Sequence, residues 1–199
     1  QEVAELIDTS ITIDGKKHEM GWKWWKGASG QRTMDFVAWD KLHPAVVDNI
    51  KIELTDLVFF TLSQKIMEDL TGEDEIVQLS ENDWVNFMSI SAYNLMQRPG
   101  AAMITIILLA QKLNFNISAY YVAKHTLNVI RQLSGYKDGS YKKVVNGKED
   151  NELLHDVING ITVEQMSDDF ETQANKIMIG VYDVFSVDES NRKTFKDWK

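Results

Sequence analysis

Hydrophobic residues recur at helical spacing along much of the chain. They fall largely three or four positions apart within residues 50–62, 118–133 and 163–185. No stretch alternates apolar and polar residues for long enough to predict a sheet. The pattern therefore predicts an all-α protein with helices at residues 1–8, 45–70, 83–96, 100–113, 117–134, 150–159 and 163–185.

Two prolines and two polar segments mark interruptions of this helical pattern. Pro44 and Pro99 each stand where an irregular segment gives way to a helical one, a position that suits proline. Residues 12–21 and 135–151 are unusually polar, and the second segment holds several glycines and an Asn-Gly pair that favour turns. Neither has the composition of a domain linker. We expect a single domain over residues 1–199, with a long loop of the kind that often carries function.

The composition narrows the available chemistry. The 199 residues are 44% hydrophobic and carry a formal net charge of -9, which argues against a surface for nucleic acid. The chain has no cysteine, which excludes disulfides, thiolate metal sites and a thiol nucleophile. The longest apolar run, residues 101–110, is about half of the ~20 residues that a membrane span needs, and no signal peptide is recognisable. We expect an intracellular, cytoplasmic protein that binds neither membranes nor nucleic acid.

Two pairs of carboxylates are spaced for a shared site. Glu2 and Glu5 stand three positions apart, as do Glu53 and Asp56, and this spacing places each pair on one face of a helix. One such pair is common on solvated surfaces, but Glu53 and Asp56 lie in an apolar segment that should be partly buried. If the two faces meet, the carboxylates need a divalent cation or shared protons to coexist. Ligation by oxygen alone favours Mg²⁺, Mn²⁺ or Ca²⁺.

A di-iron carboxylate bundle is the competing interpretation of these acidic helices. Such bundles carry two Glu-x-x-His motifs, whereas this sequence has one, from Glu152 to His155. Because the second motif is missing, the carboxylate pairs fit a hard cation better. We interpret His155 as a helix-surface or packing residue.

A polar row leads into a basic loop in the second half of the chain. Lys124, Asn128 and Arg131 recur at helical spacing beside an apolar stripe. Lys and Arg could hold phosphate oxygens at two points with Asn between them, although a solvated helix face is the alternative. Six basic residues lie between positions 124 and 148 of this acidic protein. Carboxylates combined with one basic patch indicate a metal-bridged polyphosphate ligand.

A tryptophan cluster occupies residues 21–27, GWKWWKG, and includes Trp22. A Trp ring can stack on a base or a sugar, but three together more often pack in a core or a dimer interface. The sequence contains no glycine-rich phosphate loop, and nothing in it supports a serine triad.

Four segments carry a resemblance to a known family. They are EVAELID at 2–8, WKWWK at 22–26, KIELTDL at 51–57 and, above all, FNISAYYVAKHTLNVIRQLSGYKDGSYKKVVNGKEDNELLH at 115–155. In this order they resemble the dimeric all-α dUTPases of the kinetoplastid and Campylobacter type, within the MazG-like nucleoside triphosphate pyrophosphohydrolase superfamily. The acidic motifs alone would suggest only the superfamily, whereas the last segment singles out the dUTPase branch.

The resemblance implies a homodimeric multi-helix bundle with a carboxylate metal site between helices. It implies Mg²⁺-dependent hydrolysis of dUTP to dUMP and pyrophosphate, and of dUDP to dUMP and phosphate, in which a metal-bound, glutamate-activated water attacks the β-phosphorus. Glu2, Glu5, Glu53 and Asp56 match the family's metal ligands, with Glu2, or else Glu5, as the general base. The matching substrate-binding positions are Trp22 near the base, Asn128 at the nucleoside, and Lys124, Arg131, Tyr136, Lys143 and Asn151 mainly around the phosphates.

The chain also departs from this family in two ways. Family members have a helix before the first acidic motif that helps to recognise uracil, whereas this chain starts inside that motif at Gln1. Residues 10–21 and 27–47 look like insertions. Two alternatives stay open: a MazG-like pyrophosphohydrolase of another nucleotide such as dCTP, and a catalytically inactive helical binding module.

Overall fold

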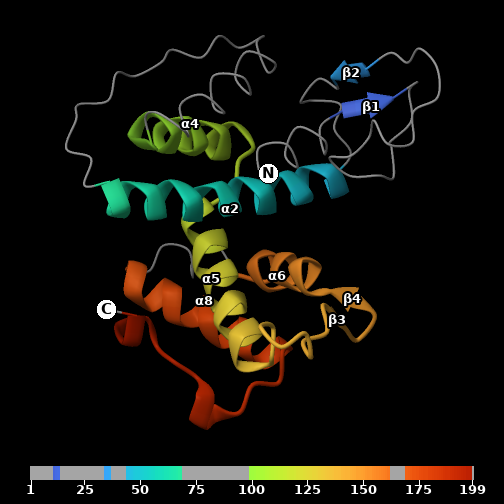
Figure 1. Ribbon diagram of the computed structural model, residues 1–199, viewed down its shortest axis with the longest axis vertical. Coiled ribbons are helices and arrows are strands. Elements are labelled where there is room, and N and C mark those ends of the chain that lie inside the picture. Colours follow the sequence, from blue (N-terminus) through green and yellow to red (C-terminus); the bar gives the residue numbers. More distant parts are fainter. Residues whose placement is uncertain (1–10, 14–33, 37–43, 69–98, 162–168, 199) are drawn as a thin grey trace. The chain divides into compact units, whose positions relative to one another are not determined.

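Figure 1 shows the computed structural model of the protein, which describes residues 11–13, 34–36, 44–68, 99–161 and 169–198. The chain divides into two units, Gln1–Phe115 and Asn116–Lys199. The helices predicted at residues 1–8 and 83–96 lie outside the described residues. Most of what is described is helical, as predicted. None of the described helices has both the length and the apolar character to cross a membrane.

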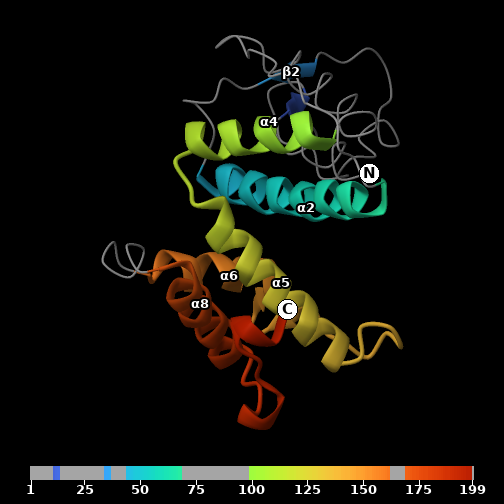
Figure 2. The same cartoon turned by 90° about the vertical axis from the view of Figure 1, so that its left-hand side faces the viewer.

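Two long helices form most of the described part of the first unit. α2 (Pro44–Glu68) and α4 (Pro99–Lys112) lie side by side and run antiparallel (Figures 1 and 2). Each begins with a proline, whose fixed φ suits the first helical turn, where its missing N–H costs little. The helices predicted at residues 45–70 and 100–113 are therefore confirmed. Their buried apolar side chains are Ile50, Ile52, Leu54, Leu57 and Val58 on α2, and Ala102, Ile106, Leu109 and Ala110 on α4.

A short antiparallel strand pair also belongs to the first unit. β1 (Ile11–Ile13) pairs with β2 (Met34–Phe36), with Ile11 opposite Phe36. Strands of three residues are too short for an alternating pattern to stand out in the sequence, which is why the periodicity predicts helices alone.

The second unit is built on three helices that all contact one another. They are α5 (Ile117–Leu133), α6 (Asp150–Asn159) and α8 (Phe170–Val184). The helices predicted at residues 117–134 and 150–159 are confirmed. Of the helix predicted at residues 163–185, positions 163–168 lie outside the described residues. α8 begins at Phe170, where Asp169 caps it by accepting a hydrogen bond from the Thr172 N–H. The fully buried apolar side chains are Ala119, Val122, Ala123 and Leu127 on α5, Leu154 on α6, and Ala174, Ile177, Met178, Val181 and Tyr182 on α8.

A β-hairpin with a two-residue turn leads directly into α6. β3 (Val144–Val145) pairs with β4 (Lys148–Glu149) across Asn146 and Gly147, which both have positive φ, at 53° and 82°. Two positive φ values in a two-residue loop are typical of a type I′ turn, which an Asn-Gly pair favours. The Asp150 N–H then donates to the Lys143 carbonyl oxygen at 2.8 Å. The hairpin therefore fixes the residue with which α6 begins.

The C-terminal segment packs back onto the helices of the second unit. Two short 3-10 helices, η3 (Glu189–Asn191) and η4 (Phe195–Trp198), follow α8. The centroids of the Trp198 and His125 rings lie 4.1 Å apart, so η4 covers part of α5. Burial lowers the pKa of His125 below its ordinary value.

Candidate active site

Glu53 and Asp56 lie one turn apart on α2, as their spacing predicts. Both side chains are half-buried, and the Oε2 atom of Glu53 is itself buried. Two carboxylates placed in this way repel each other more strongly than they would in bulk water, so a nearby cation lowers their free energy. A donor set made only of oxygen fits a hard divalent cation such as Mg²⁺.

The rest of the predicted metal site lies outside the described residues, because Glu2 and Glu5 are not among them. The same holds for Trp22. In the part of the chain that is described, no group of three or more Asp, Glu or His side chains is placed to hold a metal ion. Glu53 and Asp56 provide at most half of the expected ligand set, and the four-carboxylate site stays a prediction.

Glu152 and His155, the one Glu-x-x-His motif, serve the local structure of α6. The Glu152 carboxylate accepts a hydrogen bond from the Glu149 N–H at 3.0 Å and completes a capping box at the start of the helix. The Nδ1 atom of His155 lies 2.9 Å from the Tyr120 hydroxyl oxygen on α5, and the two rings meet edge to face. These contacts support a capping and packing role for the motif over that of an iron ligand.

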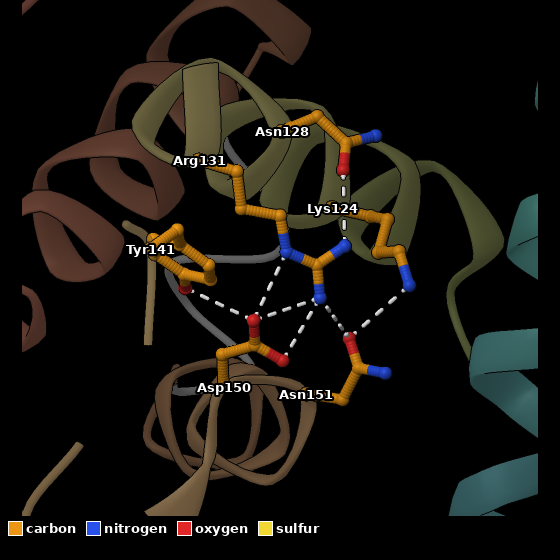
Figure 3. Close-up of polar contacts among 6 residues, drawn as sticks. All are labelled: Lys124, Asn128, Arg131, Tyr141, Asp150 and Asn151. Carbon is orange, nitrogen blue, oxygen red and sulfur yellow. Dashed lines mark hydrogen bonds and ion pairs between the residues drawn. The ribbon is translucent and has the colours of Figure 1, made fainter. Parts of the chain in front are cut away.

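The predicted polar row is present on α5. Lys124, Asn128 and Arg131 project from the helix toward the start of α6 (Figure 3). Lys124 is only 3% exposed, and its Nζ donates a hydrogen bond to Asn151 Oδ1 at 3.1 Å. A buried ammonium group is costly unless polar atoms surround it, so this geometry argues against a plain solvated face. The residues named from the sequence at positions 124, 128, 131 and 151 do come together.

Arg131 is held by Asp150, which no spacing pattern in the sequence singles out. Its Nε donates to Asp150 Oδ2 at 3.0 Å and its Nη2 donates to Oδ1 at 2.9 Å, so the pair is bidentate (Figure 3). Asp150 is 2% exposed. Two longer contacts run from Nη1 to Asn128 Oδ1, at 3.4 Å, and from Nη2 to Asn151 Oδ1, at 3.5 Å. A half-buried arginine requires an acidic partner, and this requirement is the clue in the sequence that could have pointed to Asp150.

Tyr141 is the second member of this group that the sequence patterns miss. Its hydroxyl donates to Asp150 Oδ2 at 2.9 Å. Burial, together with the hydrogen bond to the negatively charged Asp150, raises the pKa of Tyr141 to about 12. We refer to these contacting residues as the α5–α6 cluster: Lys124, Asn128, Arg131, Tyr141, Asp150 and Asn151.

The two remaining residues of the predicted set lie at the edge of this cluster. Tyr136 is exposed, and its ring centroid lies 6.2 Å from that of Tyr141. Lys143 has an exposed side chain, while its backbone carbonyl accepts the Asp150 N–H. Nothing in the sequence pattern separates Tyr136 from Tyr141, because their difference in burial arises from the turn between them.

The α5–α6 cluster carries less positive charge than a count of its basic residues suggests. Asp150 offsets the charge of Arg131, and Lys148 of the same loop pairs with Asp156 at 2.6 Å. Lys124, Arg131 and Asp150 together leave one net positive charge. An oligophosphate carries several negative charges, so binding one here calls for further cations, such as exposed lysines or a divalent metal ion.

Comparison with models of known protein families gives a match. A family model described as dUTPase matches residues 30–136, more than half of the chain. The matched region includes α2 with Glu53 and Asp56, and α5 with Lys124 and Arg131. No curated protein sequence matches the chain.

Proposed function

The chain belongs to the all-α dimeric dUTPase family, and from this membership we propose that the acidic face of α2 supplies metal ligands and that the α5–α6 cluster binds the substrate. The protein is a dUTP diphosphatase, and the family is named for this activity. The observation that carries the proposal is the gathering of two cations and two amides around α5, a helix inside the matched region. The substrates are dUTP, cleaved to dUMP and pyrophosphate, and dUDP, cleaved to dUMP and phosphate.

The phosphate groups bind to Lys124, Arg131 and Asn151. Asn151 Oδ1 lies 3.1 Å from Lys124 Nζ and 3.5 Å from Arg131 Nη2, so one neutral oxygen is shared by two cationic groups. A phosphate oxygen carries more negative charge than an amide oxygen and makes stronger hydrogen bonds to such donors. Lys143 and Tyr136 complete the phosphate contacts from the exposed loop.

The nucleoside binds beside Asn128 and Trp22. The Asn128 carboxamide turns its oxygen to Arg131, and its nitrogen points away from the guanidinium (Figure 3). That nitrogen is then a donor for a carbonyl of the base or for a sugar hydroxyl. The Trp22 ring packs near the base.

Mg²⁺ is the proposed cofactor, held by Glu53 and Asp56 together with Glu2 and Glu5. The oxygen-only donors on α2 and their half-buried position support this assignment. When bound, Mg²⁺ neutralises phosphate charge and lowers the pKa of water. Titration of the purified protein with Mg²⁺ should raise its melting temperature, and an absence of any response would contradict a metal site.

Hydrolysis proceeds by attack of water on the β-phosphorus. Glu2, or alternatively Glu5, accepts the proton as the water oxygen bonds to phosphorus. The bond from the β-phosphorus to the oxygen that bridges it to the α-phosphorus breaks, and dUMP leaves with that oxygen. Lys124 and Arg131 stabilise the negative charge that develops on the phosphate oxygens.

Water labelled with oxygen-18 tests this direction of attack. Attack at the β-phosphorus places the label in pyrophosphate when dUTP is cleaved, and in phosphate when dUDP is cleaved. Label found in dUMP would mean attack at the α-phosphorus instead.

Pyrophosphate release from dUTP, dCTP, dTTP and UTP, measured with Mg²⁺ or with excess EDTA, tests the substrate assignment. We expect Mg²⁺-dependent cleavage confined to dUTP, and cleavage of dUDP to dUMP. Turnover of several nucleotides would replace this assignment with a broader pyrophosphohydrolase, and no turnover at all would favour an inactive binding module.

We also propose that the protein is a homodimer, as membership of the all-α dimeric dUTPase family implies. Sedimentation equilibrium should give twice the chain mass of 22.8 kDa. A single-chain mass over the concentration range of the activity assays would contradict this.

A further inference from the structure

Arg131 is tied to Asp150 along one particular edge of its guanidinium group. We propose that Asp150 is a positioning residue, which fixes the edge of Arg131 that meets the phosphate groups of the substrate; this inference rests on the proposed function. Asp150 does not touch the substrate in this proposal. It acts through Arg131 alone.

The hydrogen bonds show which edge is taken. Asp150 accepts from Nε at 3.0 Å and from Nη2 at 2.9 Å, which occupies the edge that these two nitrogens share. Among the described residues, the other edge, between Nη1 and Nη2, meets amide oxygens, at 3.4 Å from Asn128 and 3.5 Å from Asn151. A guanidinium offers five N–H donors in a rigid plane, so fixing one edge also fixes the direction of the other.

The two sets of contacts differ in strength. The contacts to Asp150 are short and joined by opposite charges, whereas those to the amides are longer and involve a neutral acceptor. Both sets have a charged donor, but the Asp150 pair adds a charged acceptor and two parallel hydrogen bonds, which makes it the stronger of the two. An arriving phosphate oxygen therefore displaces the amide contacts and leaves the Asp150 pair intact.

Asp150 is itself held firmly enough to act as an anchor. It is 2% exposed, it is the first residue of α6, and its N–H is bonded to the Lys143 carbonyl in line with the β3–β4 hairpin. Its Oδ2 accepts from both Arg131 Nε and the Tyr141 hydroxyl. A carboxylate at the N-terminus of a helix is further stabilised by the helix dipole.

The same contacts separate Asp150 from the acidic residues that would hold metal or accept a proton. Oδ2 already receives two hydrogen bonds, and Oδ1 receives one from Arg131 Nη2. A metal ligand or a general base needs an open lone pair directed at the metal or the water. Three of the roughly four acceptor sites of this buried carboxylate are thus filled, so Asp150 is better suited to orienting Arg131 than to either of those roles.

The first test compares Asp150→Asn with Asp156→Asn. Asp156 lies on the same helix and also pairs with a basic residue, Lys148, but its side chain is 54% exposed. D150N keeps the side-chain volume and loses the two-point acceptor, so Arg131 can turn. We expect KM for dUTP to rise about tenfold or more in D150N, with kcat changed far less, and D156N to match the wild type. A merely structural role would lower the active fraction, and with it kcat, at unchanged KM.

A double-mutant cycle tests whether Asp150 acts through Arg131. R131K keeps the charge but lacks the planar fork, and it should raise KM by itself. If Asp150 works only by holding that fork, D150N should raise KM by less than about twofold in the R131K background. Independent, multiplying effects would overturn the proposal.

A third readout does not depend on turnover. The chain contains four arginines, so the Arg Nε–H signals in a nitrogen-15 spectrum are few enough to assign with R131K. The Arg131 signal should be slow to exchange with water in the wild type and in D156N, and fast in D150N. A signal that does not change in D150N would overturn the proposal.

These outcomes separate the inference from the proposed function. If the wild-type protein cleaves no dUTP, both the proposed function and the positioning role of Asp150 are wrong. If the wild type cleaves dUTP and R131K raises KM while D150N behaves like D156N, the proposed function stands and the positioning role of Asp150 fails.

Discussion

The acidic face of α2 and the α5–α6 cluster are built on opposite electrostatic principles. On α2, Glu53 and Asp56 bring two like charges together within one turn of one helix. In the cluster, Arg131 and Asp150 bring opposite charges together from positions 19 apart, at 2.8 Å. Like charges gain from an added cation, whereas a paired cation with weak secondary contacts gains from an added anion. The first region is suited to binding a metal ion and the second to orienting a phosphate.

The largest expected effect on activity is that of Glu53→Gln on α2. It removes one of the two like charges without changing the side-chain volume. We expect turnover of dUTP to fall at least about a hundredfold, since loss of even an outer-sphere partner of a metal ligand costs roughly 10- to 100-fold. The helical circular dichroism signal should stay at the wild-type level, and the rise in melting temperature on adding Mg²⁺ should disappear.

Asp48→Asn is the matched control for this variant. Asp48 lies on the same helix, eight positions before Asp56, and pairs with Lys51 at 2.9 Å. It should retain both turnover and the response to Mg²⁺. Loss of the fold in E53Q, in place of the loss of turnover, would make Glu53 a structural residue.

Lys124→Met tests the phosphate side of the comparison and should have the next largest effect. Met preserves much of the buried apolar stem but removes the ammonium group that contacts Asn151. A charge-assisted hydrogen bond contributes roughly 1.5–3 kcal/mol, so we expect KM for dUTP to rise by about ten- to a hundredfold. Lys148→Met removes an exposed lysine of the adjoining loop and should leave KM unchanged. Equal effects of the two variants would mean that only overall charge matters.

The two regions also differ in how far the sequence predicts them. The helix of Glu53 and Asp56 follows from local periodicity, and so does the row of Lys124, Asn128 and Arg131 on α5, because both patterns are completed within a few turns. Helix α6 was likewise predicted with its bounds, 150–159. Local spacing contains this information before any tertiary contact forms.

The pairing of Arg131 with Asp150 could not be predicted in the same way. It depends on the type I′ turn at Asn146 and Gly147, on the start of α6, and on the packing of α6 against α5. The Asn-Gly pair indicates a turn, but which residue that turn places beside Arg131 depends on the tertiary packing. The choice of Tyr141 over Tyr136 likewise depends on which ring the loop buries.

Gly135→Ala tests the loop that delivers Tyr141 to the cluster. Gly135 has a φ of +87°, and an added Cβ would lie 1.9 Å from Ser140 Oγ. Gly139 is the matched control, since it has a similar φ of +80° with nothing within 4 Å of an added Cβ. The positive φ should cost each alanine variant about 1 kcal/mol, and the clash should bring G135A to about 2 kcal/mol. Urea unfolding measures both values, and equal values would show that the Ser140 side chain turns aside freely.

The smallest expected effect concerns the tyrosine that joins this loop to Asp150. Tyr141 has an ordinary pKa of 10.0 when unfolded and a pKa of about 12 in the folded protein. Below pH 10 both states are protonated, so the hydrogen bond to Asp150 contributes its full stability there. Between pH 10 and 12 the unfolded chain loses this proton first, so the contribution of Tyr141 is lost as the pH rises.

Tyr141→Phe isolates this contribution. The variant should be less stable than the wild type at pH 8 by about 1 kcal/mol, after allowing for solvent screening of a partly exposed group, and the difference should narrow by pH 11. Tyr136→Phe removes an exposed hydroxyl from the same loop and controls for the loss of a phenol. Urea unfolding of the three proteins at both pH values gives the comparison. If the difference in free energy of unfolding between Y141F and the wild type is the same at both pH values, the ionisation of Tyr141 is not coupled to the charge of Asp150. Arg131 alone would then compensate that charge.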